Sequence, residues 1–273
     1  MSSHFNISRI WAITAFELAR LFGSKRGLVV LSSFSLIWFL IFYYIIGSAS
    51  DFISTETFKS IAKQAFGQLN LSALLEWDLP ELTIYWIVSA YILPFFALMF
   101  TCDQTCSDRE RGTLRFILLR TSRTELLYGR FLGQLLIISI LILVTLIASL
   151  LFASFNQQDV SLSSMGLSII ILLKLIAISL PFIASMALIN VFVSSAKMSL
   201  IAYSLIYIGL GIVISLLNNF VFDVSFLFYV FPGGQIENII GFQSNSFTSF
   251  GIPLLQTLGY LLVAQFVFKR ASL

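Results

Sequence analysis

The chain has 273 residues, of which 58% are hydrophobic and 11% charged, and its mean hydropathy is +0.96. This composition excludes a soluble domain, a disordered chain, a secreted disulfide scaffold and a nucleic-acid-binding module, and it identifies an integral membrane protein. The net charge of +3 is small, so the positions of the 16 basic and 13 acidic residues are more informative than their sum.

Residues 1–26 precede the first long apolar run and contain apolar residues at helical spacing, among them Trp11 and Leu18. We expect a helix that lies on the inner surface of the membrane, with Glu17 and the basic residues directed away from its apolar stripe. This polar, amphipathic start does not look like a cleavable signal peptide.

Six stretches are long and apolar enough to cross about 30 Å of hydrocarbon. They cover residues 28–46, 83–101, 131–155, 167–193, 199–220 and 252–268. Thirteen of the 16 basic residues fall on one side of these spans: Arg9, Arg20, Lys25, Arg26, Arg109, Arg111, Arg115, Arg120, Arg123, Arg130, Lys197, Lys269 and Arg270. The positive-inside rule makes that side the cytoplasm and places both termini there.

The loop between the first two spans contains a second apolar stripe, from Phe58 to Leu69. It predicts an amphipathic helix on the outer surface of the membrane. A packing surface for a partner subunit is the alternative interpretation.

The cytoplasmic segment 103–130 carries six arginines and a short apolar run. Gly112 suits the end of a charged helix, and Thr113 is expected to cap a new short helix over residues 114–119. Ser122 and Glu125 form a capping box that would start the third span below the membrane. An apolar helix presented to the cytosol usually binds a partner protein. The alternative is that it packs on its own bundle or on lipid headgroups, and the sequence pattern alone does not decide between the two.

The chain offers little chemistry for catalysis. Its one histidine, His4, lies in the N-terminal tail, and Cys102 and Cys106 are too few for a metal site. The six apolar stretches contain no carboxylate, and the sequence has no HExxH, GxSxG or GxxxxGK[ST] motif. We therefore expect no catalytic residue, no metal and no cofactor bound by this chain.

Lys174 is the ionisable residue that falls inside an apolar stretch. Such a residue is a candidate substrate contact, while a long side chain that snorkels to the outer interface is the alternative.

The region 221–250 is too apolar for a free outer loop and is interrupted by Pro232, Gly233 and Gly234. We expect a helix, a break and a second helix that dip into the outer leaflet, because backbone groups at that depth must be satisfied internally. A flexible outer loop is the alternative.

The stretch DRERGTLRFILLRTSRTELLYGRFLG resembles the cytoplasmic coupling segment of ABC-2-type permeases, the membrane subunits of ATP-binding-cassette exporters. The resemblance assigns coupling with an ATPase subunit to Glu110, Gly112, Thr113, Leu114, Ile117, Leu118, Ser122 and Arg123. Gly129 and Arg130 also match the family pattern. Glu17 and Leu18 match a frequent Glu-Leu pair in the N-terminal helix of the family. Thr121 departs from the pattern, since a proline is common in that turn. The large outer loop is most similar to the branch of the gliding-motility permeases and of the permease for nitrous oxide reductase maturation.

The resemblance implies an all-α membrane protein that forms a single domain over residues 1–273. The expected parts are six transmembrane helices, the N-terminal interfacial helix, a cytoplasmic coupling helix and re-entrant outer helices before the last span, as in type V ABC exporters. It also implies the bacterial inner membrane as location.

The function implied is that of a permease subunit, not itself an enzyme, that exports or extracts a hydrophobic or amphipathic substrate. Its implied partners are two copies of an ABC ATPase subunit, which would bind ATP and Mg, and a second permease subunit, identical or different. A periplasmic protein is a further candidate partner, and the main alternative is ATP-driven mechanical signalling to that protein without transport. An ion-coupled carrier is a third alternative, which would need no ATPase.

Overall fold

The computed structural model describes residues 6–47, 77, 79–156, 162–220, 225–240 and 247–270, and this part of the chain consists of helices joined by turns, with no strand. The helices are α1 (Ile7–Gly23), α2 (Lys25–Leu40) with its continuation η1 (Ile41–Ile46), α5 (Pro80–Thr101), α6 (Cys106–Glu110), α7 (Leu114–Leu118), α8 (Arg123–Phe155), α9 (Leu162–Phe192), α10 (Ala196–Phe220), η4 (Ser225–Val230), α11 (Ile236–Ile240), η5 (Phe247–Gly251) and α12 (Ile252–Arg270). The predicted helix over residues 58–69 lies outside the described residues, as does His4.

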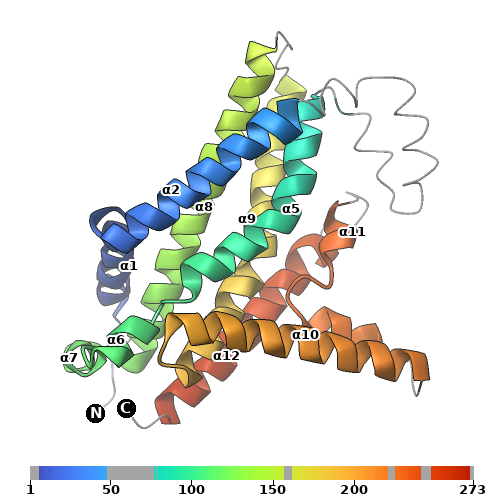
Figure 1. The fold of residues 1–273 in the computed structure, drawn as a ribbon. Helices are drawn as coiled ribbons and strands as arrows, with labels where there is room; N and C mark the ends of the chain where they lie inside the picture. Colours follow the sequence, from blue (N-terminus) through green and yellow to red (C-terminus); the bar gives the residue numbers. More distant parts are fainter. Residues whose placement is uncertain are drawn as a thin grey trace.

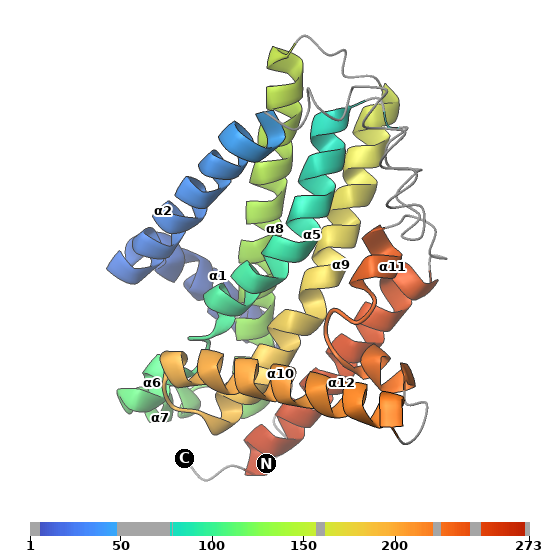
Figure 2. The same ribbon diagram turned by 45° about the vertical axis from the view of Figure 1, so that its right-hand side comes forward.

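Six helices in the described part are long and apolar enough to cross a membrane, the same number as the predicted spans. α5, α8, α9 and α12 pack side by side (Figures 1 and 2). α5 and α9 form the centre, because 61% of the apolar stretch of each is buried, against 22% in α2 and 11% in α10.

α6, α7, the start of α8 and the end of α12 lie together at one end of the bundle, which we call the α6–α7 end (Figure 1). Many of the basic residues predicted to be cytoplasmic belong to these elements. This end is therefore the one that the positive-inside rule would place in the cytoplasm.

α10 differs from the other long helices in direction. Its range agrees with the predicted fifth span, yet Figures 1 and 2 show it lying across the bundle instead of along it. Apolar composition decides whether a helix can sit in lipid, whereas its tilt is set by packing against neighbouring helices. α10 has few such neighbours within this chain, and Leu205 and Ile208 on it are 68% and 59% exposed.

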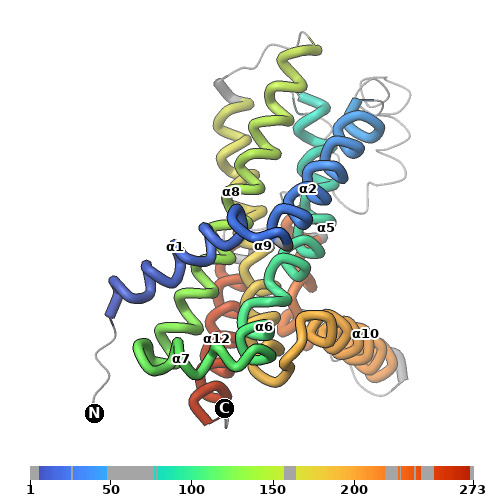
Figure 3. The backbone as a smooth tube through the Cα atoms, turned by 60° about the vertical axis from the view of Figure 1, so that its left-hand side comes forward, coloured from blue at the N-terminus to red at the C-terminus, as the bar shows by residue number. Residues whose placement is uncertain are grey.

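α1 crosses the lower half of α8 (Figure 3). Glycines let the two helices approach closely, since a Cβ on Gly129 would lie 2.8 Å from Ile13 Cβ, and one on Gly133 would lie 2.8 Å from Glu17 Cβ. Thr14 Oγ1 also donates a hydrogen bond to the Gly129 carbonyl at 2.9 Å. Small residues spaced in this way are a common device for close helix crossings in membranes.

The prediction for the faces of α1 was wrong in part. Glu17 is buried against α8 rather than directed away, while Trp11 and Phe16 are 64% and 62% exposed. The reason is a tertiary contact, because α8 supplies polar partners for the Glu17 carboxylate. The buried face of α1 is therefore partly polar, and its outer face is apolar. An apolar outer face still suits a helix that lies on a membrane.

Candidate functional site

The turn between α6 and α7 is built around Gly112 and Asp108. Gly112 has φ +70°, a left-handed conformation that favours glycine and ends α6. Thr113 does not cap α7 as predicted, because its own backbone is helical and its hydroxyl donates to the Asp108 carbonyl at 3.2 Å and to Asp108 Oδ1 at 3.1 Å. The result is a tight turn that joins two helices of five residues each.

The start of α8 confirms the predicted capping box. Glu125 N donates to Ser122 Oγ at 3.2 Å, and Ser122 N donates to Glu125 Oε2 at 2.8 Å. The other carboxylate oxygen, Oε1, accepts from the backbone N–H of Asn6 at 3.0 Å, just before α1, and Arg9 lies 3.8 Å from Oε2. One carboxylate therefore ties the first residues of α1 to the first turn of α8.

A cluster of buried charges joins α1, α6 and α8. Arg130 on α8 pairs with Asp108 on α6, and its Nε lies 3.8 Å from Glu17 Oε1. Arg20 on α1 lies 3.7 Å from Glu17 Oε1 and donates to Asp103 Oδ2 at 3.2 Å. Burial raises the pKa of Glu17 above its usual range, although Arg130 and Arg20 pull it down. The cluster links three separate segments through paired charges, so removing one member would leave another buried without its partner.

α6 is also fixed to the ends of α9 and α10. Arg109 donates to the Val191 carbonyl at 2.7 Å, and Thr105 Oγ1 donates to the Asn190 carbonyl at 3.1 Å. The Cys106 thiol is buried against Asn190 Oδ1 at 3.3 Å and Ser199 Oγ at 3.2 Å. A displacement of α6 would therefore disturb its bonds to α9 and α10 as well as its contacts with α1 and α8.

α7 presents two different faces. Leu114 is 2% exposed and belongs to an apolar cluster with Leu126, Val191 and Phe268, and Ile117 and Leu118 pack against that cluster. The large apolar residues exposed at α7 are instead Phe116, at 73%, and Leu119, at 81%.

Two exposed charges adjoin these residues in the sequence. Arg115 precedes Phe116, Arg120 follows Leu119, and both are exposed. We call these four residues the α7 surface. Of the residues predicted to contact a partner, the structure places Leu114 in the interior of its own bundle, while Glu110, Gly112 and Thr113 remain at the exposed turn.

Arg123 holds the first turn of α8 against the end of α12. Its Nη1 donates to the carbonyls of Phe268 and Lys269 at 2.7 and 3.2 Å. Thr121, at the position where a proline is common in the resembling family, donates its backbone N–H to the Ile117 carbonyl at 3.1 Å. A proline could not make that bond, so the turn here uses a donor that the family pattern would lack.

Lys174 lies on α9, twelve residues after its first residue Leu162, which is about 18 Å along the helix. Its side chain is 6% exposed. This burial does not suit a side chain that follows a lipid-facing surface toward the outer interface. Whether the ammonium group contacts a substrate stays a prediction.

The predicted break before the last span is present, with η4 on one side and α11 on the other. Gly233 has φ +93°, and a Cβ there would lie 3.0 Å from Phe182 on α9. Gly234 follows in the same turn. Pro232 is buried, and its carbonyl accepts a hydrogen bond from Tyr207 Oη at 3.1 Å.

Side chains of α12 satisfy the other carbonyls at the break. Gln256 Nε2 donates to the carbonyls of Tyr229 and Phe231, the latter at 3.0 Å, and Tyr260 Oη donates to the Val230 carbonyl at 2.8 Å. Gln256 also pairs with Gln235 at 3.0 Å. Backbone of this kind is tolerated at membrane depth when protein groups satisfy it, as they do here.

Sequence reasoning did not find the partnership of Glu17 with Arg130, or the role of Gln256. A carboxylate that interrupts an apolar stripe and a glutamine inside a span are both weak signals of buried polar contacts. No group of three or more potential metal-ligating residues occurs within the described ranges.

The family model for "ABC-2 family transporter protein" matches residues 11–273, nearly the whole chain. No curated protein matches it.

Proposed function

Because this chain belongs to the ABC-2 family of transporter proteins, we propose that it is the permease subunit of an ABC exporter, driven by ATP that a separate subunit hydrolyses. ATP and Mg would be bound by that partner. The complex would contain two permease subunits, identical or different, and two ATPase subunits in the bacterial inner membrane, with both termini of this chain in the cytoplasm.

The α7 surface carries this proposal. Phe116 and Leu119 are large apolar side chains that the bundle leaves exposed, and Arg115 and Arg120 lie beside them. Burying such a surface in a groove of the ATPase subunit would be favourable, and the arginines would select an acidic rim. Leu114, Ile117 and Leu118 would anchor the coupling helix to its own bundle rather than to the partner.

Force applied to the α7 surface has a short route into the membrane. The turn at Gly112 and Thr113 leads to Asp108, whose carboxylate pairs with Arg130 on α8. Arg130 and Glu17 continue the route to α1. ATP-driven closure of the two ATPase subunits would then tilt α1 and α8 together and change the angle between the two permease subunits.

The substrate side of the proposal rests on the apolar spans and on Lys174. A hydrophobic or amphipathic substrate fits the long apolar faces, and the enclosed ammonium group of Lys174 would attract an anionic part of it. The hairpin around Pro232, Gly233 and Gly234 would dip into the outer leaflet and close the route on that side.

Mechanical signalling to a periplasmic protein is the second candidate function. The outer loop motivates it, because residues 47–82 are long enough to hold a partner-binding helix, although that helix lies outside the described residues. In this case ATP hydrolysis would move the spans without moving a substrate.

Co-expression with the ATPase subunit tests the proposal. We expect the two polypeptides to copurify in equal amounts and, in vesicles, to couple ATP hydrolysis to net movement of an amphipathic substrate. A chain that purifies alone and shows gradient-driven transport would contradict the exporter and favour a carrier. ATPase activity that responds only to a periplasmic protein would favour signalling.

A further inference from the structure

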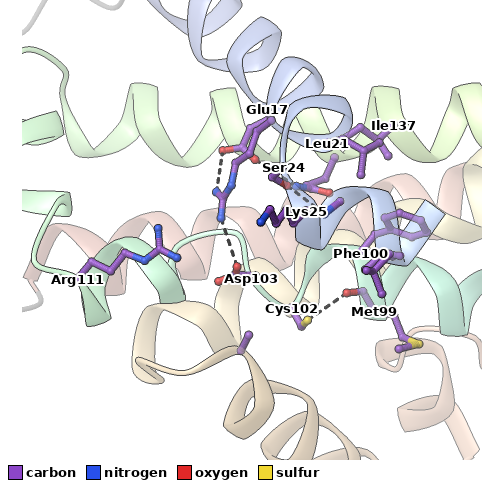
Figure 4. A pocket seen from close by; sticks show the side chains of 16 residues that line it. Glu17, Leu21, Ser24, Lys25, Met99, Phe100, Cys102, Asp103, Arg111 and Ile137 are labelled. Carbon is purple, nitrogen blue, oxygen red and sulfur yellow. Dashed lines mark hydrogen bonds and ion pairs between the residues drawn. The ribbon is translucent and has the colours of Figure 1, made fainter. Parts of the chain in front are cut away.

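A cavity of about 560 Å³ lies beside the elbow between α1 and α2. The end of α5, the lower part of α8 and the first residue of α10 complete its wall (Figure 4). The elbow is sharp, since a Cβ on Gly27 would lie 2.0 Å from the Leu21 carbonyl oxygen. The cavity therefore occurs where the predicted interfacial helix turns into the first span, which is the depth of lipid headgroups.

The two sides of this cavity differ in chemistry. Glu17, Asp103 and Arg111 lie on one side, whereas Leu21, Ile137, Phe100 and Met99 lie on the other (Figure 4). Val29 and Val30 extend the apolar side along α2, and Val29 is 62% exposed. An occupant must therefore be amphipathic, with its apolar part directed along α2 and α5.

The charges left unpaired in the cavity are positive. Glu17 and Asp103 are both partnered by Arg20, and Asp103 Oδ1 also accepts from the Ser107 backbone N–H at 2.9 Å. Lys25 and Arg111 are exposed and make no side-chain ion pair or hydrogen bond with any residue that the structure describes. An anion placed between them would be attracted by two cations from different elements, α2 and the end of α6.

We infer that this cavity binds an anionic phospholipid of the inner leaflet, with the phosphate between Lys25 and Arg111 and an acyl chain along Val30, Met99 and Phe100. The site is separate from Lys174 and from the α7 surface. Because it touches α1, α5, α8 and the end of α6, a bound lipid would contact the same helices that carry the buried charge cluster. The inner-leaflet placement rests on the orientation proposed above, but binding itself does not.

Native mass spectrometry of the full-length protein tests this inference. The protein is mixed with equal amounts of phosphatidylglycerol and phosphatidylcholine of identical acyl chains, and the retained lipids are counted. One cation near a membrane surface changes affinity about fivefold, so Lys25→Gln with Arg111→Gln should reduce the preference for phosphatidylglycerol about 25-fold. The charge-retaining exchange Lys25→Arg with Arg111→Lys should rescue it.

Two further variants distinguish lipid binding in this cavity from a general attraction of the lipid by surface charge. Lys269→Gln with Arg270→Gln removes the same number and kinds of charge at the end of α12, away from the cavity, and should leave the preference intact. Val30→Trp should fill the apolar side and lower retention of both lipids. Inorganic phosphate in excess should not displace phosphatidylglycerol, because it lacks the acyl chain.

Equal retention of the two lipids by the unaltered protein would overturn the inference. So would an unchanged preference in the Lys25 and Arg111 double variant, an equal loss in the α12 control, or displacement by phosphate alone. None of these results depends on ATPase docking or on transport, so failure here and failure of the exporter proposal are distinguishable.

Discussion

Replacing Phe116 and Leu119 with aspartate would test whether the α7 surface docks an ATPase subunit. The two side chains are 73% and 81% exposed, so nearly all of their surface is available to a partner and little of it supports the fold of this chain. The double variant should therefore insert and fold normally while losing the partner.

The size of the effect follows from the area at stake. Full burial of one such side chain is worth about 1.5–3 kcal/mol, and roughly three-quarters of each is free to be buried on docking, which gives roughly 2–5 kcal/mol for the pair. This corresponds to a loss of affinity of about 30- to 4,000-fold. Carboxylates buried in an apolar groove would add a desolvation cost and move the effect toward the upper end.

The assay is copurification of the ATPase subunit with tagged permease, followed by titration in nanodiscs. Phe155→Asp is the control for the effect of a new exposed carboxylate. Phe155 is 83% exposed at the far end of α8, so this variant also replaces an exposed ring by a carboxylate. An ATPase that remains bound in equal amounts and fully active with the double variant would refute the docking surface. Aspartate at Leu114 would not test docking, because it would disrupt the apolar cluster within this chain.

Four other changes probe the site. Ser122→Ala removes one half of the capping box and should lower the stability of the permease by about 1 kcal/mol while the complex still assembles, as read by thermal melting and copurification. Arg130→Gln leaves Asp108 without its paired cation and Glu17 with Arg20 alone, and it should cost roughly 3–5 kcal/mol, with α1 becoming accessible to protease. Burial raises the pKa of Glu17 in the folded protein, so this group stabilises the fold fully at pH values below the ordinary carboxylate pKa. That stabilisation is lost as pH rises through the pKa of the folded state. Glu17→Gln should therefore flatten the dependence of the melting temperature on pH over this range. Lys174→Gln should reduce transport of an anionic substrate without reducing assembly, whereas unchanged transport would show that its ammonium group does not contact the substrate.

Local signals in the sequence predicted local structure well. The pair of Ser122 and Glu125 specified the start of α8, and Gly112 specified the end of α6, because each acts on backbone groups within a few residues. The six long helices followed from apolar length alone. Thr113 shows the limit of such rules, since Asp108 five residues away competes for its hydroxyl.

Features set by distant residues were not predictable in the same way. The run from Leu114 to Leu119 is apolar around much of the helix, so only its contacts with α8, α9 and α12 decide which residues are buried. Glu17 is inward because Arg130, more than a hundred positions later, faces it. The direction of α10 likewise depends on packing, which periodicity does not encode.

The bond between Asn6 and Glu125 has a consequence for how the protein is made. During synthesis α1 emerges from the ribosome more than a hundred residues before the glycines and the carboxylate of α8 that receive it. Until then Glu17 must remain hydrated, and the exposed apolar side of α1, with Trp11 and Phe16, can hold the helix at the bilayer surface. Insertion of the third span, α8, would then supply the partners of α1, so the first helix of the chain reaches its final position only after three later helices have entered the membrane.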